Sequence, residues 1–192
     1  SQVNNPLFVR KNNGDWHSFS FTSTSTVNRH LGDIVIDNIG QKWVVVPSGV
    51  GLVVYNDNNT IDVVQDDQDK VLGSSLGSGN LPSTSVYSLA KDRDGEIWVG
   101  TNKGIAVFYS PENAFSDYDF AAQQILVDVD GYVEYLLGNE TVTAIAVDGA
   151  NRKWLGTQSG GLFLVSPDGT EQIYHFTQEN SPLLSNLSLI HI

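Results

Sequence analysis

The chain has 192 residues, no cysteine, and a formal net charge of −12 from 22 acidic and 10 basic residues. This charge repels phosphate backbones and anionic lipid surfaces, so nucleic acids and membrane surfaces are not expected partners. The lack of cysteine excludes disulfides, a thiolate nucleophile and cysteine-ligated zinc, which is compatible with an oxidising compartment. The apolar runs are too short for membrane insertion, and residues 1–5 lack the pattern of a signal peptide. Without methionine, the chain is expected to be a trimmed or processed piece of a longer protein.

Two short strands are the first elements expected along the chain. Residues 7–10 and residues 16–21 flank the turn residues Gly14 and Asp15, and they predict the last two strands of a β-sheet blade. Trp16 has no aspartate six residues before it, so it occupies a different position from the tryptophans of the repeat described next. Residues 1–21 are therefore interpreted as a partial blade.

An internal repeat covers most of the remaining chain. Residues 33–55, 88–108 and 144–164 align without a gap, and Asp37, Asp92 and Asp148 fall in one column, 55 and 56 residues apart. Each aspartate is followed by Gly or Asn three residues later, by Trp six residues later, and by Gly six residues after the Trp. The full set is Asp37, Gly40, Trp43 and Gly49; Asp92, Gly95, Trp98 and Gly104; and Asp148, Asn151, Trp154 and Gly160.

Each column of the repeat has a physical reason. Gly, Gly and Asn are the residues that best accept a positive φ in a tight hairpin, and an aspartate carboxylate can accept bonds from the backbone of such a turn. Apolar β-formers flank each turn, and a third apolar strand follows the second glycine. Each tryptophan is expected to wedge between neighbouring sheets, and the apolar first strands are expected to be buried on both faces.

The spacing of these segments predicts an all-β fold, a β-propeller fragment of about four four-stranded antiparallel blades, cut from a larger propeller. Fourth, outer strands are expected at residues 61–64, within residues 123–137, and at residues 172–176. We place three complete blades at about residues 31–80, 81–137 and 138–180, and the first strand of a further blade at residues 185–192. The terminal strands either combine into a makeshift blade or leave exposed edges that offer a route to a homo-oligomer.

No catalytic constellation stands out in the sequence, and no cofactor is expected. The acidic run with Asp62, Asp66, Asp67 and Asp69 is a weak candidate for calcium, and a solvated acidic surface is the favoured explanation. The Asp-x-Asp-Gly of residues 92–95 falls on the repeat hairpin, so turn chemistry explains it. His30 has no specific acid partner. Four basic residues could contact an anionic ligand or be ordinary turn residues: Arg29, Arg93, Lys103 and Arg152.

The repeat resembles that of the two-component-regulator propellers, with the pattern I-x-x-D-x-x-G-x-x-W-x-G-T-x-x-G shown most fully by residues 89–105 and 145–162. In that family, paired propellers form the extracytoplasmic sensor of hybrid histidine kinases. Residues 79–101, 148–157 and 166–186 are also similar to PorZ-type proteins of the Bacteroidetes type IX secretion machinery. That resemblance implies a cell-surface location and a part in delivering anionic lipopolysaccharide. The first repeat departs from the pattern, because residues 45–47 replace its Gly-Thr.

These observations leave several functions open. The leading hypothesis is a non-catalytic, periplasmic or cell-surface binding and scaffold module, PorZ-like, with protein partners or a glycan or lipopolysaccharide-type ligand. The first alternative is the ligand-sensing propeller of a hybrid two-component histidine kinase. A second is a propeller glycan lyase, which requires His, Arg and acids on one face of the disc. A third is a purely structural element without a small ligand.

Overall fold

The computed structural model describes residues 7–23, 31–47, 49–116, 118–129 and 131–188. Three four-stranded antiparallel sheets and two hairpins make up the fold. The first hairpin is formed by β1 (Leu7–Arg10) and β2 (Trp16–Phe19). The first sheet contains β3 (Ile34–Ile36), β4 (Lys42–Val46), β5 (Gly51–Asn56) and β6 (Gln68–Leu72). The second contains β7 (Val86–Lys91), β8 (Ile97–Thr101), β9 (Gly104–Phe108) and β10 (Gln123–Gln124).

The remaining strands complete the third sheet and the second hairpin. That sheet contains β13 (Val142–Val147), β14 (Lys153–Thr157), β15 (Leu162–Val165) and β16 (Gln172–Phe176). The hairpin of β11 (Leu126–Val129) and β12 (Tyr132–Tyr135) lies between the second and third sheets in sequence, and a short 3₁₀ turn, Pro111–Asn113, lies between β9 and β10. Within the described part of the chain, no helix is long and apolar enough to cross a membrane.

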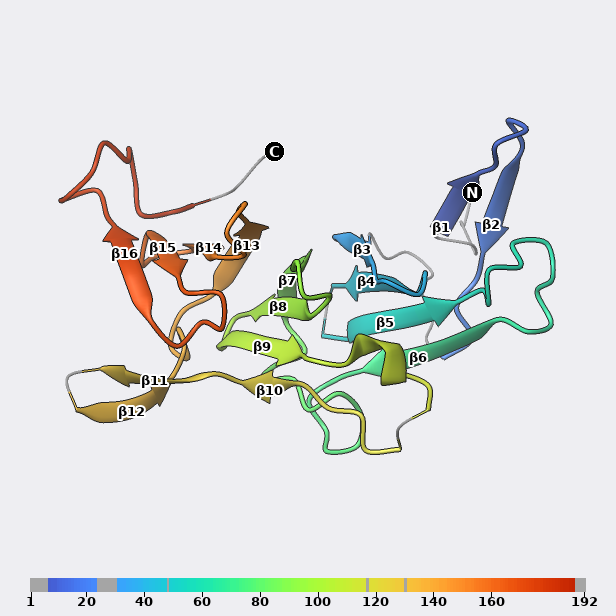
Figure 1. Ribbon diagram of the computed structural model, residues 1–192, viewed down its shortest axis with the longest axis horizontal. Helices are drawn as coiled ribbons and strands as arrows, with labels where there is room; N and C mark the ends of the chain where they lie inside the picture. Colours follow the sequence, from blue (N-terminus) through green and yellow to red (C-terminus); the bar gives the residue numbers. More distant parts are fainter. Residues whose placement is uncertain (1–6, 24–30, 48, 117, 130, 189–192) are drawn as a thin grey trace.

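The three sheets are arranged as propeller blades. In each sheet the strands follow one another as a meander, and Figure 1 shows the sheets fanned out side by side, with β3, β7 and β13 near the centre. The first strand of each later sheet contacts the first two strands of the sheet before it: β7 contacts β3 and β4, and β13 contacts β7 and β8. The predicted all-β propeller fold with four-stranded antiparallel blades is therefore confirmed.

The hydrophobic core lies between the sheets. Trp43, which is fully buried, packs against Phe108 of the second sheet at a ring-centroid distance of 5.1 Å. Trp98 is likewise fully buried and lies in one cluster with Leu155 and Phe163 of the third sheet. Trp154 occupies the same column but is only half-buried, stacked on Phe176 of its own sheet. Two of the three tryptophans therefore join neighbouring blades.

The outer strand of the first sheet is not at residues 61–64, as the sequence suggested. Those residues form turns, and Val63 and Val64 are 45% and 53% exposed. A backbone hydrogen bond holds the chain in this turn, since the N–H of Val63 donates to the carbonyl of Thr60 at 2.8 Å. The fourth strand is instead β6, in which Leu72 is fully buried opposite Leu52.

The first strand of the first sheet is also less buried than the sequence suggested. Ile34 is 47% exposed, whereas Leu89 and Ile145, in the same column, are 6% and 9% exposed. Ile34 is paired with Val44, whose side chain belongs to the cluster formed with the N-terminal strands. Only the two-stranded hairpin β1–β2 covers that side in the described residues, so no inner strand is there to bury Ile34.

Candidate functional site

The repeated aspartates organise the hairpin between the first two strands of each sheet. In all three, one carboxylate oxygen accepts a hydrogen bond from the backbone N–H two residues later and another from the N–H four residues later. The distances are 3.0 and 2.9 Å at Asp37, 3.0 and 2.9 Å at Asp92, and 2.8 and 3.0 Å at Asp148. These bonds satisfy the exposed donors of a tight turn, as in an Asx turn.

The third residue of each hairpin has the left-handed backbone conformation. Gly40, Gly95 and Asn151 have φ values of 92°, 93° and 61°. Glycine accepts such angles without strain, and asparagine accepts them better than most side chains. The Gly, Gly and Asn of this column therefore share one conformation.

The glycine at the next turn is displaced in two of the three repeats. Gly51, Gly104 and Gly161 each have positive φ and sit where a Cβ would lie 2.5 Å or less from a carbonyl oxygen of the neighbouring segment. The repeat alignment places Gly49 and Gly160 in this column instead of Gly51 and Gly161. Gly160 has no positive φ, and Gly49 has φ of 82° but lies in the turn before β5. The backbone contact that excludes a side chain is thus carried by Gly51 and Gly161.

The second carboxylate oxygen of the aspartate has different partners in different blades. In the first sheet, Asp37 accepts hydrogen bonds from the indole N–H of Trp43 at 3.0 Å and from the amide of Gln41 at 2.7 Å. The Gln41 amide also donates to the carbonyl of Pro111, in the segment after β9. This chain of bonds connects the first blade to the second.

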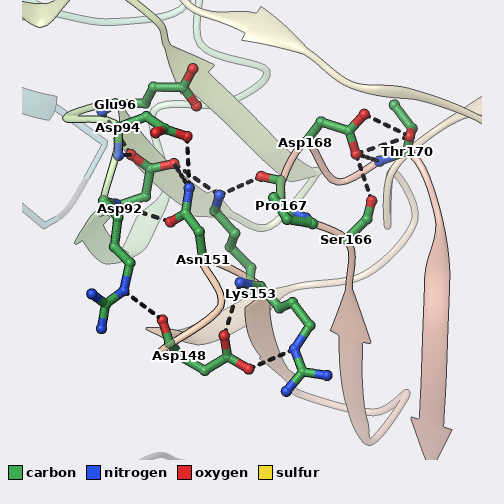
Figure 2. A network of polar contacts seen from close by, with 12 residues as sticks. Asp92, Asp94, Glu96, Asp148, Asn151, Lys153, Ser166, Pro167, Asp168 and Thr170 are labelled. Atoms are coloured by element: carbon green, nitrogen blue, oxygen red, sulfur yellow. Dashed lines mark hydrogen bonds and ion pairs between the residues drawn. The ribbon is translucent and has the colours of Figure 1, made fainter.

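A buried ion pair connects the second blade to the third (Figure 2). Lys153 Nζ lies 2.8 Å from Asp92 Oδ2, and both side chains are fully buried. The ammonium also donates to the carbonyl of Pro167 and lies 4.4 Å from the ring centroid of Trp98. Burial alone would raise the pKa of Asp92, but the bonds from Lys153 and from the backbone N–H of Glu96 outweigh it and hold the pKa below its usual range.

The arginines near this ion pair, Arg93 and Arg152, form hydrogen bonds with other residues of the hairpin turns. Arg93 Nε donates to the carbonyl of Asp148 at 2.9 Å, and the backbone N–H of Arg93 donates to Asn151. Arg152 Nε donates to the Asp148 carboxylate at 2.7 Å. Asn151 also reaches the Asp94 carboxylate across the blade boundary at 2.8 Å. The polar side chains of the hairpin turns therefore act mainly as bridges between blades.

The carboxylates of the acidic segment before and within β6 bond to separate partners and do not form one site. Asp69 accepts bonds from Thr22 and Ser23, which hold its pKa below the usual range although burial opposes this. Asp67 accepts from the Tyr55 hydroxyl and Asp66 from Thr60, whose oxygen lies 2.9 Å away. Throughout the described ranges, no group of three or more His, Cys, Asp or Glu is arranged to hold a metal. His30 and Arg29 lie outside the described residues.

A pocket of about 220 Å³ lies between the hairpin β11–β12 and the turn that leads into β16. Its walls combine apolar side chains of the hairpin with carboxylates, amides and a hydroxyl. The lining includes Val127, Glu134, Asn139, Glu140, Thr170 and Gln172. No pattern in the sequence predicted this pocket. The sequence did contain a signal for the hairpin that borders the pocket. Apolar and polar residues alternate around the Asp-Gly pair at residues 130–131, which is typical of a β-hairpin.

The fold and the repeat together define a class, the β-propellers built from Asp-Gly-Trp blades. Residues 80–103 match the family model described as the two component regulator propeller, so the chain carries a repeat of that family. The structure is similar to PorZ, an essential bacterial surface component of the type IX secretion system of Porphyromonas gingivalis. The two are 32% identical with a TM-score of 0.79, and the match covers 94% of this chain and 25% of PorZ.

Two other relatives are a histidine kinase and the extracellular domain of a hybrid two-component system. A stretch of 77 residues is 36% identical to histidine kinase P4 of Formosa agariphila, covering 40% of this chain and 5% of that protein. The extracellular domain of a hybrid two-component system of B. thetaiotaomicron is 22% identical with a TM-score of 0.57, covering 87% of this chain and 18% of that chain. At that identity the likeness shows the fold alone. The chain thus spans a quarter or less of each of these relatives.

Proposed function

We propose that the chain is part of a non-catalytic propeller that binds and scaffolds outside the cytoplasm, as a PorZ-like component of a type IX secretion machinery. The observation that carries this proposal is the likeness to PorZ, which extends over nearly the whole chain in both sequence and structure. The PorZ protein is a bacterial surface component, which supports a periplasmic or cell-surface location for this chain.

The contacts of the hairpin turns support a scaffold role. Asp92, Lys153 and Asn151 bond across the boundary between two blades. We infer that the buried ion pair contributes to fixing one arrangement of the two blades that it joins. A propeller whose blades are fixed in this way can present its loops and its hairpin to protein partners or to a glycan or lipopolysaccharide-type ligand.

A sensor propeller of a hybrid histidine kinase is the second candidate. It is favoured by the match at 36% identity to histidine kinase P4 and by the two-component-regulator model at residues 80–103. Both candidates use the same fold and differ in what the propeller is attached to and what it signals.

One genetic experiment separates the two candidates. Deletion of the parent gene in its host should leave type IX cargo unsecreted, and a copy of the gene should restore secretion. A strain that secretes normally but loses a transcriptional response to glycans would instead assign the chain to a sensor kinase. Turnover of a polysaccharide by the purified chain would contradict the non-catalytic role.

A further inference from the structure

A second pocket, of about 340 Å³, lies where the hairpin turns of the first and second blades meet. The first blade contributes the turn residues Asn38 and Ile39, and the second blade contributes Asp94 and Gly95. The segment after β9 adds Tyr109, Pro111 and Glu112 to the wall. We call this pocket the first notch, because equivalent turns meet again at the boundary between the second and third blades.

The equivalent place at that second boundary is filled by the carboxamide of Asn151. Its Oδ1 accepts a hydrogen bond of 2.9 Å from the backbone N–H of Arg93, the residue after the repeat aspartate. Its Nδ2 donates to the Asp94 carboxylate at 2.8 Å, and Figure 2 shows the side chain directed toward Asp92 and Asp94. One carboxamide therefore satisfies both a backbone donor and a carboxylate of the preceding blade.

The first notch lacks this carboxamide at the equivalent position. Gly95 occupies the column of Asn151, and Asn38 occupies the column of Arg93. Gly95 and Asn151 share the left-handed conformation, with φ of 93° and 61°, so the two turns differ in the side chain and not in the backbone. Because glycine has no side chain, residue 95 offers no acceptor to the backbone N–H of Asn38.

The groups around the first notch favour a ligand that both accepts and donates hydrogen bonds. The backbone N–H of Asn38 needs an acceptor, whereas the exposed carboxylate of Glu112 needs a donor. The carboxylates of Glu112 and Asp94 disfavour an anion. An ammonium or guanidinium has no acceptor, and Lys91 already places a positive charge 3.2 Å from Asn38 Oδ1. A carboxamide carries one acceptor oxygen and two N–H donors and no charge.

We propose that the first notch binds a side-chain carboxamide, that of a glutamine or asparagine presented by a partner polypeptide. The ligand oxygen accepts from the N–H of Asn38, as Asn151 accepts from Arg93, and the ligand N–H groups donate to Glu112. The aliphatic part of the ligand packs against the exposed side chains of Ile39 and Tyr109. This inference rests on the proposed binding role and names the side chain by which one partner is recognised.

The test is an NMR titration of the nitrogen-15-labelled chain with N-acetylglutamine N-methylamide, followed at the backbone amide of Asn38. We expect a saturable shift of this signal with a Kd on the order of millimolar, as for other very small ligands. The corresponding methionine derivative has a side chain of similar length without a carboxamide, and it should leave the signal unchanged. The lysine derivative should bind more weakly than the glutamine one, because it cannot accept a hydrogen bond.

Variants of the chain locate the site. Gly95→Asn reproduces the third repeat and should abolish the response, because the chain then fills the notch itself. The neighbouring Asn38 side chain is flexible and can move aside. Gly40→Asn makes the same change in the same column of the first blade, outside the notch, and this matched control should bind as the wild type does. Glu112→Ala should weaken binding by about two- to tenfold, because it removes the acceptor for the ligand N–H groups.

Four results would overturn the proposal: no shift with the glutamine derivative, an equal shift with the methionine derivative, a full response in a folded Gly95→Asn variant, or a full response in Glu112→Ala. Stronger binding of the lysine derivative would also overturn it and would assign the notch to a cationic group. Each of these results leaves the scaffold role standing, because the secretion experiment measures that role separately.

Discussion

At the residue scale, burial between blades decides what each tryptophan contributes. Trp98 is fully buried between the second and third sheets, whereas Trp154 is half-buried on the far face of the third. We expect Trp98→Ala to lower the free energy of unfolding by about 3–5 kcal/mol, the usual cost of removing a large buried side chain. Trp154→Ala should cost less, about 1–2 kcal/mol, because less apolar area leaves water on folding. Urea titration of both variants measures the difference, and a loss below about 1 kcal/mol for Trp98→Ala would contradict its place in the core.

The buried aspartate of the second blade predicts a response to acid. Its pKa is lower in the folded chain than in the unfolded one, so its contribution to stability is present above the unfolded pKa. That contribution is lost as pH falls through the folded pKa, below about pH 4. Asp92→Asn should therefore flatten the decline of unfolding free energy with acid. Urea titration from neutral pH to about pH 3 tests this, and an unchanged slope would contradict the stabilisation of the Asp92 carboxylate by Lys153 and the N–H of Glu96.

At the element scale, the turn before the third strand of the third blade depends on one of two adjacent glycines. Gly161 has φ of 93°, and its Cβ would lie 2.2 Å from the carbonyl oxygen of Phe176. Gly160 lacks positive φ and would meet mainly the flexible side chain of Glu140. We expect Gly161→Ala to cost at least about 1–3 kcal/mol and Gly160→Ala to be nearly neutral. Thermal unfolding of the two variants gives the answer, and equal losses would place the strain elsewhere.

The elements show which parts of the fold could be predicted from the sequence. The hairpin between the first two strands repeats as a short local pattern, and its Asp, Gly and Trp are readable without tertiary information. The outer strand β6 was missed because its acidic residues resemble a loop, and only pairing with β5 makes it a strand. The hairpin β11–β12 had a local signal, but its pocket also needs Thr170 and Gln172 of another blade.

The contacts between blades were harder to predict than the blades themselves. The column of Lys153 holds Ile97 in the second repeat and Lys42 in the first, so it shows no constant chemistry. Lys42 pairs with Asp57 of its own sheet, whereas Lys153 pairs with Asp92 of the preceding one. Which carboxylate a buried lysine reaches depends on how the sheets stack, and the local sequence pattern around each lysine does not reveal that stacking.

At the scale of the whole molecule, the blades are held by apolar packing supplemented with polar bridges. Gln41 bridges the first blade to the segment after β9, and Lys153 bridges the third blade to the second. Replacing one member of a buried pair leaves the other charge unpaired, whereas replacing both with groups of similar shape can be nearly neutral. The surface pair of Arg152 and Asp148 lies beside the buried one and provides a matched comparison.

A double-mutant cycle between Asp92 and Lys153, with unfolding free energies from urea titration, tests whether this ion pair couples the second and third blades. We predict that Lys153→Met alone costs about 3–5 kcal/mol, and that adding Asp92→Asn recovers much of this loss. The coupling energy should then exceed about 1.5 kcal/mol, whereas the Arg152–Asp148 cycle should give about 0–1 kcal/mol. A coupling near zero for the buried pair would contradict the claim that the repeat aspartate locks neighbouring blades together.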